Sequence, residues 1–250
     1  MLHITPIAAF NDNYIWLLHN ATHAVVIDPG DATPVIEALK QYKLTLSAVL
    51  ITHYHADHIG GVAQLLAYQQ APVYAPRYEE YVFERIKVAE GDNVVLSEIS
   101  QSFRIMHLPG HTLGHIAFVN DAYLFCGDTL FGAGCGRLFE GSPAQMLKSL
   151  NRLKTLNKSI KVYCTHEYTA KNIAFALTLE PANADLLARQ NQVQKWRAAQ
   201  KPSLPSTIEL ELKTNPFLRC NQTSIVQLSQ AEKTDELSVF TAIRTLRNHY

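Results

Sequence analysis

The stretch Thr52–Gly61, THYHADHIGG, places three histidines and one aspartate within six residues. The run Ala48–Ile51 directly before it is short, partly β-branched and apolar on both faces, which is typical of a buried strand. Gly60 and Gly61 let the chain turn into Val62–Leu66, whose pattern predicts a helix. We therefore expect the cluster on the loop after the carboxyl end of a buried strand, the usual place for a site in an α/β sheet.

The residue types of this loop indicate a metal site. His53 and His55 alternate along an extended segment, so both imidazoles can reach one ion. Asp57 and His58 follow as the chain turns, and they project towards a different point. Imidazole and carboxylate ligands suit zinc, and also iron or manganese. The alternative, a polar loop whose histidines only cap a helix, is improbable for three histidines in six residues.

The H-x-H-x-D-H pattern resembles the metallo-β-lactamase superfamily, which implies further ligands downstream. The segments PGHTLGH (109–115), CGDTLF (126–131) and CTHEY (164–168) each follow an expected strand and supply the candidates. The resemblance implies one ion held by His53, His55 and His111, a second held by Asp57, His58 and His166, and Asp128 bridging both. Two divalent ions, zinc or alternatively iron or manganese, would then generate a bridging hydroxide as nucleophile, with Asp57 orienting it or taking its proton.

The pattern of apolar residues predicts a strand-rich part followed by a helical tail. Expected strands cover residues 2–7, 14–18, 24–28, 48–51, 71–74, 103–108, 116–119, 122–126 and 161–164. Expected helices cover residues 34–41, 62–66, 78–86, 143–153, 172–179, 182–200 and 236–247. With the resemblance, this implies an α/β (α+β) fold, the αββα sandwich, with a small C-terminal α-helical domain. We expect residues 1–168 to form the catalytic domain and residues 169–250 a helical substrate-binding domain.

Two residues near the ligands are expected to support them rather than bind metal. Asp28 ends a strand beside a Pro-Gly turn, and in the superfamily an acid there lies under the metal site and orients the loop. His115 follows His111 by four residues and is expected to hydrogen-bond near the site. His107 alternates with apolar neighbours and is expected to be a packed or surface histidine. Cys126 and Cys164 lie in apolar strands, which favours core positions.

Further motifs narrow the resemblance to the glyoxalase II, or hydroxyacylglutathione hydrolase, family. They include NDNYIW (11–16), GCGR (134–137), THEYT (165–169) and NPFLR (215–219), and the resemblance runs almost from end to end. It implies hydrolysis of S-(2-hydroxyacyl)glutathione thioesters, from S-D-lactoylglutathione to D-lactate and glutathione. This reaction is the second step of the glyoxalase pathway, which detoxifies methylglyoxal.

The substrate residues are expected on the tail and near the last ligand. Arg244 and Arg247 are three residues apart on the final expected helix, so they share a face. The resemblance implies that this pair holds the glycyl carboxylate, while Tyr168 and the Arg137 region contact the peptide. A solvated basic helix end is the alternative. Some relatives carry tyrosine where this chain has Phe139, which cannot donate a hydroxyl hydrogen bond.

Composition limits the other classes of function. Lysine plus arginine and aspartate plus glutamate number 22 each, so the neutral total gives no general attraction to nucleic acid or anionic lipid. No apolar run approaches the ~20 residues of a membrane span, and no signal peptide is evident. Four cysteines without C-x-x-C spacing favour reduced thiols in the cytoplasm. We expect a monomer, because no amphipathic seam demands a partner.

Rival functions use the same fold. A lactonase or β-lactamase would leave Arg244 and Arg247 unexplained. A phosphodiesterase of the RNase Z kind would need a basic arm, and a sulfur dioxygenase would lack ligands that are present here. A non-enzymatic metal-binding module would not need the full seven-ligand set.

Overall fold

A computed structural model describes all 250 residues of the chain. The chain forms two compact units, each built from two segments. The first unit contains residues 1–107 and 114–127, and the second contains residues 108–113 and 128–250. No helix combines the length and the apolar character that crossing a membrane requires.

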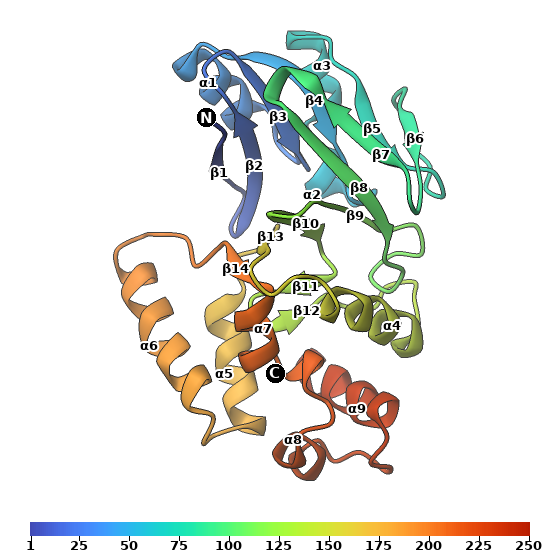
Figure 1. Cartoon of the computed structure of the whole chain (residues 1–250), viewed down its shortest axis with the longest axis vertical. Helices are drawn as coiled ribbons and strands as arrows, with labels where there is room; N and C mark the ends of the chain where they lie inside the picture. Colours follow the sequence, from blue (N-terminus) through green and yellow to red (C-terminus); the bar gives the residue numbers. More distant parts are fainter. The chain divides into compact units, whose positions relative to one another are not determined.

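The first unit is built on a six-stranded mixed sheet, seen in blue to cyan in Figure 1. Its strands follow the order of the sequence: β1 (His3–Ala9), β2 (Asn13–His19), β3 (His23–Ile27), β4 (Thr45–Leu50), β5 (Val73–Pro76) and β6 (Ile86–Val88). The first three strands pair antiparallel, and β3 to β6 pair parallel. The β1–β2 and β2–β3 connections are short, as antiparallel neighbours allow, whereas the parallel β3–β4 and β4–β5 crossovers contain helices.

Two helices cover one face of this sheet. They are α1 (Ala32–Tyr42) and α3 (Val62–Tyr68), with the single-turn α2 (Ala56–Ile59) before α3. Val35 and Leu39 of α1 and Leu65 of α3 lie in one buried cluster with alternate residues of the strands. The other residues of β2 and β3 are buried too, except the half-buried His19 and His23 at the strand ends, so both faces of these strands are covered. This explains their almost continuous apolar sequence.

A second, antiparallel sheet lies in the same unit. Its strands in this unit run in the order β7 (Asn93–Leu96), β8 (Gln101–His107), β9 (Ile116–Val119) and β10 (Tyr123–Gly127), with the 3₁₀ turn η1 (Ser97–Ile99) between the first two. The amide of Ile116, which opens β9, donates to the carbonyl of Thr52 at 2.9 Å. This bond fixes the start of β9 beside the loop that follows β4.

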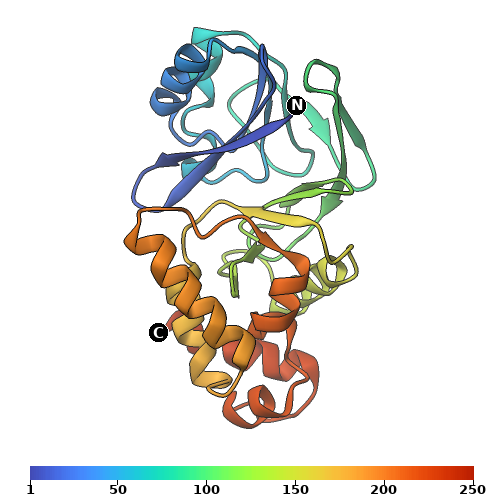
Figure 2. The same ribbon diagram turned by 60° about the vertical axis from the view of Figure 1, so that its left-hand side comes forward.

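The second unit is mainly helical, with two short strand pairs (Figure 2, yellow-green to red). Its strands are β11 (Leu130–Phe131) with β12 (Gly134–Cys135), and β13 (Lys161–Cys164) with β14 (Ser206–Thr207). Its helices are α4 (Pro143–Lys154), α5 (Thr169–Leu179), α6 (Ala184–Ala198), α7 (Ile208–Thr214), η2 (Pro216–Leu218), α8 (Thr223–Leu228) and α9 (Glu236–Asn248).

Local sequence accounts for where the longer helices begin. Ser142 caps α4 through the amide of Gln145, whose side chain returns the bond, and Pro143 occupies the first turn. Asp235 caps α9 through the amide of Ser238 at 3.0 Å. These caps are side-chain signals that the sequence alone carries.

The predicted helix over residues 78–86 is wrong. The segment forms turns and bends around the buried Glu79. The Tyr81 hydroxyl donates to the Glu79 carboxylate at 2.7 Å, and Arg85 donates to the Glu79 carbonyl at 2.6 Å. These local bonds compete with a helical ladder, and burial together with Glu79 raises the pKa of Tyr81. Strand β7 and the short helices α7 and α8 were not predicted.

Candidate active site

The histidine loop, residues 52–58, lies after β4 as the sequence predicts. Thr52 donates its hydroxyl to Asp28, so the same oxygen accepts from Nδ1 of His53 at 3.1 Å. The other nitrogen of that ring, Nε2, lies 3.1 Å from Nδ1 of His55. His53 and His55 therefore turn nitrogens to one point, as two ligands of one cation do.

Asp28 holds this loop from beneath. Its carboxylate is 2% exposed and accepts from the Thr52 amide at 2.8 Å and the Thr52 hydroxyl at 2.7 Å. Nδ1 of His58 lies 3.0 Å from the same carboxylate, which makes Nε2 the nitrogen whose lone pair can bind a cation. Asp28 has φ of 52°, a left-handed conformation that costs about 1–3 kcal/mol and is retained where surrounding contacts compensate.

Asp57 is held by a different element of the same unit. The side chain of Asn13, at the start of β2, donates to the Asp57 carboxylate at 2.9 Å. The turn at Gly30 also packs against this residue, because a Cβ there would lie 1.9 Å from the Asp57 carbonyl oxygen. The Asp57 carboxylate remains 40% exposed, in reach of solvent, and lies 3.5 Å from Nε2 of His58.

His115 is fully buried and stacks on His53, with ring centroids 4.8 Å apart. This contact places His115 beside a candidate ligand, where it restricts the ring of His53. His107 lies instead at the end of β8, with its ring 5.8 Å from the exposed Tyr78, as expected for a packed or surface histidine. Cys126 and Cys164 are fully buried, as predicted.

The second unit brings three further candidate metal ligands together. The carboxylate oxygen Oδ2 of Asp128 lies 3.4 Å from Nε2 of His111 and 3.3 Å from Nε2 of His166. All three residues are buried. Gly136 is required beside them, because a Cβ at this position would lie 1.9 Å from the Asp128 carbonyl oxygen.

The chemistry of this group fits a metal ion. Nδ1 of His111 donates to the Arg137 carbonyl at 2.7 Å, so in a neutral ring Nε2 carries a lone pair and cannot donate to Asp128. Two lone pairs facing each other at this distance are stabilised by a cation between them. Ligands ~2.0–2.1 Å from a tetrahedral zinc are separated by about 3.3 Å, close to the observed spacing.

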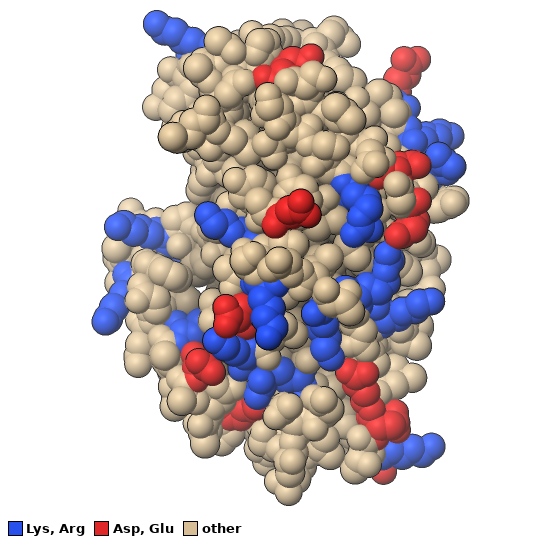
Figure 3. Space-filling model, in the orientation of Figure 1, with Lys and Arg blue, Asp and Glu red and all other residues tan.

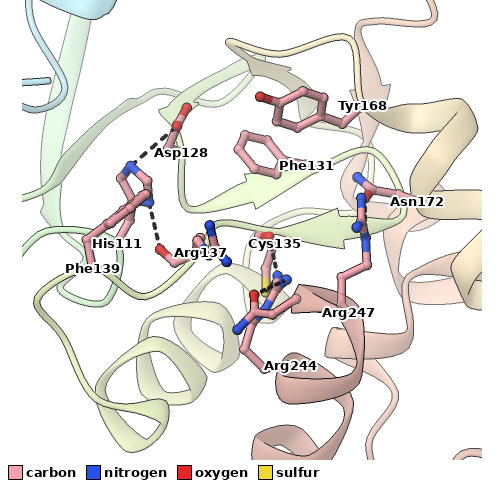
Figure 4. Close-up of a pocket in the computed structure, with 11 residues that line it drawn as sticks. His111, Asp128, Phe131, Cys135, Arg137, Phe139, Tyr168, Asn172, Arg244 and Arg247 are labelled. Carbon is pink, nitrogen blue, oxygen red and sulfur yellow. Dashed lines mark hydrogen bonds and ion pairs between the residues drawn. The ribbon is translucent and has the colours of Figure 1, made fainter. Parts of the chain in front are cut away.

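A cavity of about 340 Å³ opens beside these donors in the second unit (Figure 4). Its walls combine candidate ligands, aromatic rings, amides and three arginines: His111, Asp128, Phe131, Cys135, Arg137, Phe139, Tyr168, Asn172, Arg244, Arg247 and Asn248. All five predicted substrate residues are in this set. Tyr168 lies parallel to the ring of His166, with centroids 4.7 Å apart, so it links the cavity to a candidate ligand.

Arg244 and Arg247 share one wall of the cavity, and neither has an acidic partner. Arg244 is 7% exposed and donates to the Cys135 carbonyl at 2.8 Å. Arg247 is half-buried and donates to the side-chain oxygen of Asn172. Burial, and then the neighbouring Arg244, lower the pKa of Arg247. Burial also raises the pKa of the Cys135 thiol, which keeps this cavity residue protonated.

The β11–β12 hairpin forms the floor of the cavity and depends on the tail. The Asn215 side chain donates to the carbonyls of Phe131 and Gly134 at 3.2 and 2.8 Å. Glu211 accepts from the Ala133 amide at 2.8 Å and pairs with the buried Arg189. The NPFLR motif therefore has a structural role in shaping the cavity.

Sequence reasoning missed four residues that line the cavity: Phe131, Cys135, Asn172 and Asn248. Isolated amides, a lone cysteine and a single aromatic residue carry no spacing signal. Asn13 belongs to the quoted motif NDNYIW, but its bond to Asp57 joins residues 44 positions apart and could not be inferred from either segment alone.

The neutral total charge divides unequally between the units. The first unit has 6 basic and 12 acidic residues, a net charge of −6, and the second has 16 basic and 10 acidic residues, a net charge of +6. On the face drawn in Figure 3, blue side chains gather mainly over the second unit. The cavity with its arginines thus belongs to an electropositive unit, which favours anionic ligands.

Comparison with known proteins defines the class. Residues 9–166 match the model of the metallo-beta-lactamase superfamily, so the chain belongs to that superfamily. The fold agrees: ETHE1 from Myxococcus xanthus has a TM-score of 0.69 at 23% identity, with 98% of this chain and 91% of that chain covered. The predicted metallo-β-lactamase αββα sandwich with C-terminal helices is confirmed. This family and the His/Asp donors imply divalent metal ions.

The family within that class follows from closer relatives. Residues 167–250 match the model of the hydroxyacylglutathione hydrolase C-terminus. The hydroxyacylglutathione hydrolases of Methylobacillus flagellatus and Photobacterium profundum are 52% and 48% identical, each with both chains fully covered. The chain therefore belongs to the hydroxyacylglutathione hydrolase family, as the sequence motifs predict.

Proposed function

We propose that this protein hydrolyses S-(2-hydroxyacyl)glutathione thioesters in a metal-dependent reaction. One observation carries the proposal: a single cavity is lined by Asp128 and His111 and also by two arginines that have no acidic partner. The donors suit a cation, and the arginines suit the carboxylate of an anionic substrate. The family of the chain supports the same substrate class.

The metal site is proposed to use seven ligands. His53, His55 and His111 would hold one ion, Asp57, His58 and His166 the other, and Asp128 both. The Nδ1 contacts of His53, His58 and His111 support this assignment, because each sets the ring tautomer that presents Nε2. We propose zinc, with iron or manganese as alternatives. A 25% identical structure, TTHA1623, is described in a di-iron-bound form.

When bound, the two ions lower the pKa of water and polarise the thioester carbonyl. Asp57 is proposed to orient the attacking water or take its proton. The hydrogen bond from Asn13 supports this role, since it fixes the Asp57 carboxylate while that carboxylate remains accessible to solvent. The leaving thiol has a pKa near ~8.5, so the carbon–sulfur bond breaks without a strong general acid.

Substrate binding is proposed to follow the cavity wall. Arg244 and Arg247 hold the glycyl carboxylate, while Tyr168 and Arg137 contact the peptide. Phe139 lies edge-on to His111, with ring centroids 5.2 Å apart, and offers the substrate an apolar edge instead of a hydroxyl.

The finer biological assignment extends the same proposal. The physiological substrate is S-D-lactoylglutathione, and the products are D-lactate and glutathione, as in the second glyoxalase step. We propose that the protein works as a cytoplasmic monomer without nucleic-acid or membrane partners.

A second hydrolase function, on lactones or β-lactams, fits the same fold. A neutral lactone gives no reason for two guanidiniums that lack a carboxylate partner, and a β-lactam, which does carry a carboxylate, is disfavoured by the hydroxyacylglutathione hydrolase family of the chain. Burying a charge without an opposite partner is costly, so the pair favours an anionic substrate.

The test is loss of thioester absorbance from S-D-lactoylglutathione, with metal-replete and chelator-treated protein side by side. We expect hydrolysis by the replete protein, its loss on chelation and its return when zinc is added. Metal-replete protein that leaves this thioester intact, but opens a lactone or β-lactam, would overturn the proposal.

A further inference from the structure

The two cavity arginines are held by amide side chains. Nε and Nη2 of Arg247 donate to Oδ1 of Asn172, at 3.3 and 3.1 Å. Nη2 of Arg244 donates to Oδ1 of Asn248 at 3.1 Å. The remaining acceptors of Arg244 are backbone carbonyls and a thiol, so all hydrogen-bond acceptors of both guanidiniums are neutral.

Other arginines of the same unit show that this arrangement is not general. The buried Arg189 pairs with Glu211 at 2.6 Å, and Arg219 donates two bonds to Glu180 at 2.8 Å each. Both of these arginines tie elements of the fold together. The two structural arginines of this unit thus donate to carboxylates, whereas the two cavity arginines donate to the amide oxygens of asparagines.

Hydrogen bonds on both sides fix the orientation of the Asn172 side chain. The residue is 4% exposed, and its Nδ2 donates to the Gly132 carbonyl at 3.0 Å. This bond assigns the amide orientation, because the nitrogen faces a carbonyl and the oxygen faces a guanidinium. The side chain therefore links the β11–β12 hairpin to Arg247 and leaves Nη1 of that arginine for a ligand (Figure 4).

We propose that Asn172, together with Asn248, is a charge-selecting positioning residue: its neutral oxygen aims a cavity arginine without neutralising it. The inference rests on the proposed function for the identity of the ligand. A carboxylate at position 172 would still accept from Arg247, although it could not donate to the Gly132 carbonyl, and it would compete with the substrate carboxylate for the same guanidinium. An amide keeps the direction of the bond and leaves the positive charge for the substrate.

The charge on the two arginines supports this inference. Burial, and then the neighbouring Arg244, lower the pKa of Arg247, the direction expected for two close cations without an anion between them. An incoming carboxylate relieves that repulsion. The two neighbouring cations Arg244 and Arg247 therefore favour an anionic ligand over a neutral one.

The experiment compares glutathione with its glycyl monoethyl ester by calorimetric titration. The wild-type protein is expected to bind the free acid at least about 10-fold more tightly, since charge-assisted hydrogen bonds are stronger than neutral ones. N172D is expected to reduce this preference to about 3-fold or less. N157D is the matched control, because Asn157 is exposed, lies outside the cavity and also accepts through its side-chain oxygen.

A purely structural role for Asn172 predicts that N172D weakens the acid and the ester by the same factor, and that result would overturn the inference. N248D provides a second variant at an exposed position, so folding is not at risk. It is expected to reduce the preference at Arg244, and an unchanged acid-to-ester ratio in N248D would contradict the proposal.

Thioester turnover by the wild-type protein separates the two proposals. Turnover together with an unchanged ratio in N172D would reject the role of Asn172 and leave the function standing. A collapsed ratio without any thioester turnover would reject the function and leave the charge selection standing. Failure of the wild type to bind either glutathione or its ester would overturn both.

Discussion

In the first unit, the hydrogen-bond donors of the histidine loop donate to a carboxylate. In the second unit, the arginines of the cavity donate to amide and carbonyl oxygens. Asp28 accepts from Thr52 and His58, and it makes its surroundings more negative. Asn172 and Asn248 accept from Arg247 and Arg244, and they leave their surroundings positive. The net charges of the units, −6 and +6, follow the same division.

In both units, the charge of the hydrogen-bond acceptor next to a histidine or arginine determines whether that side chain is suited to bind a cation or an anion. A histidine backed by a carboxylate is a better ligand for a cation, because the negative charge raises the basicity of the ring. An arginine backed by an amide remains a full cation for an anionic ligand. Both arrangements fix geometry, and they differ only in the charge that they leave.

Removing the shared carboxylate should have the largest effect. D128A is expected to lower the bound metal from two ions per chain and to reduce thioester hydrolysis by at least about 10³-fold, since the ions contribute several kcal/mol to the reaction. Elemental analysis and turnover of the same samples measure both. D121A, at an exposed position outside the cavity, is the control, and full metal content in D128A would contradict the assignment.

Neutralising the acceptor beneath the loop should have an intermediate effect. D28N is expected to lower metal affinity by about 10–100-fold, because His58 loses a charged partner and the amide nitrogen of asparagine cannot accept the hydrogen bonds of one carboxylate oxygen. Competition with a chromogenic chelator measures this affinity. D31N is the matched control, since asparagine also caps α1 at that position. Equal affinities in D28N and D31N would show that Asp28 acts only on the fold.

Adding a hydroxyl to the cavity should have the smallest effect. F139Y is expected to lower KM for the thioester several-fold, because one neutral hydrogen bond contributes about 1 kcal/mol. Steady-state kinetics measure the change. Phe10 is equally exposed, at 60% against 62%, and lies outside the cavity, so F10Y is the control. A KM in F139Y that matches F10Y would remove position 139 from the substrate site.

The sequence predicted the parts of the site that lie within single segments. The spacing in residues 52–61 carries the donors, the strand before them and the helix after them, because all three are close along the chain. The seven ligands and the five substrate residues were proposed from the motifs. The division into domains at 168/169 and the roles of these residues stay predictions.

What the sequence did not reveal depends on contacts between distant residues. Asn172 was missed because its partner Arg247 is 75 positions away. The region 78–86 was predicted as a helix because its apolar spacing is helical, while the buried Glu79 and its local bonds decide the conformation. The charge division, by contrast, could have been found in the sequence, because residues 108–113 carry no charged side chain and a cut at 127/128 gives the same −6 and +6.

The dependence of the β11–β12 hairpin on Asn215 and Glu211 has a consequence for engineering. Residues 130–135 match the superfamily model, yet the side chains that shape them come from the part that matches the hydroxyacylglutathione hydrolase C-terminus. A chimera that exchanges only residues 167–250 for another tail would lose these bonds and deform the hairpin. The unit that can be exchanged between relatives is therefore the tail, residues 167–250, together with the hairpin, residues 130–135. A chimera designed for a new specificity has to replace both segments at once.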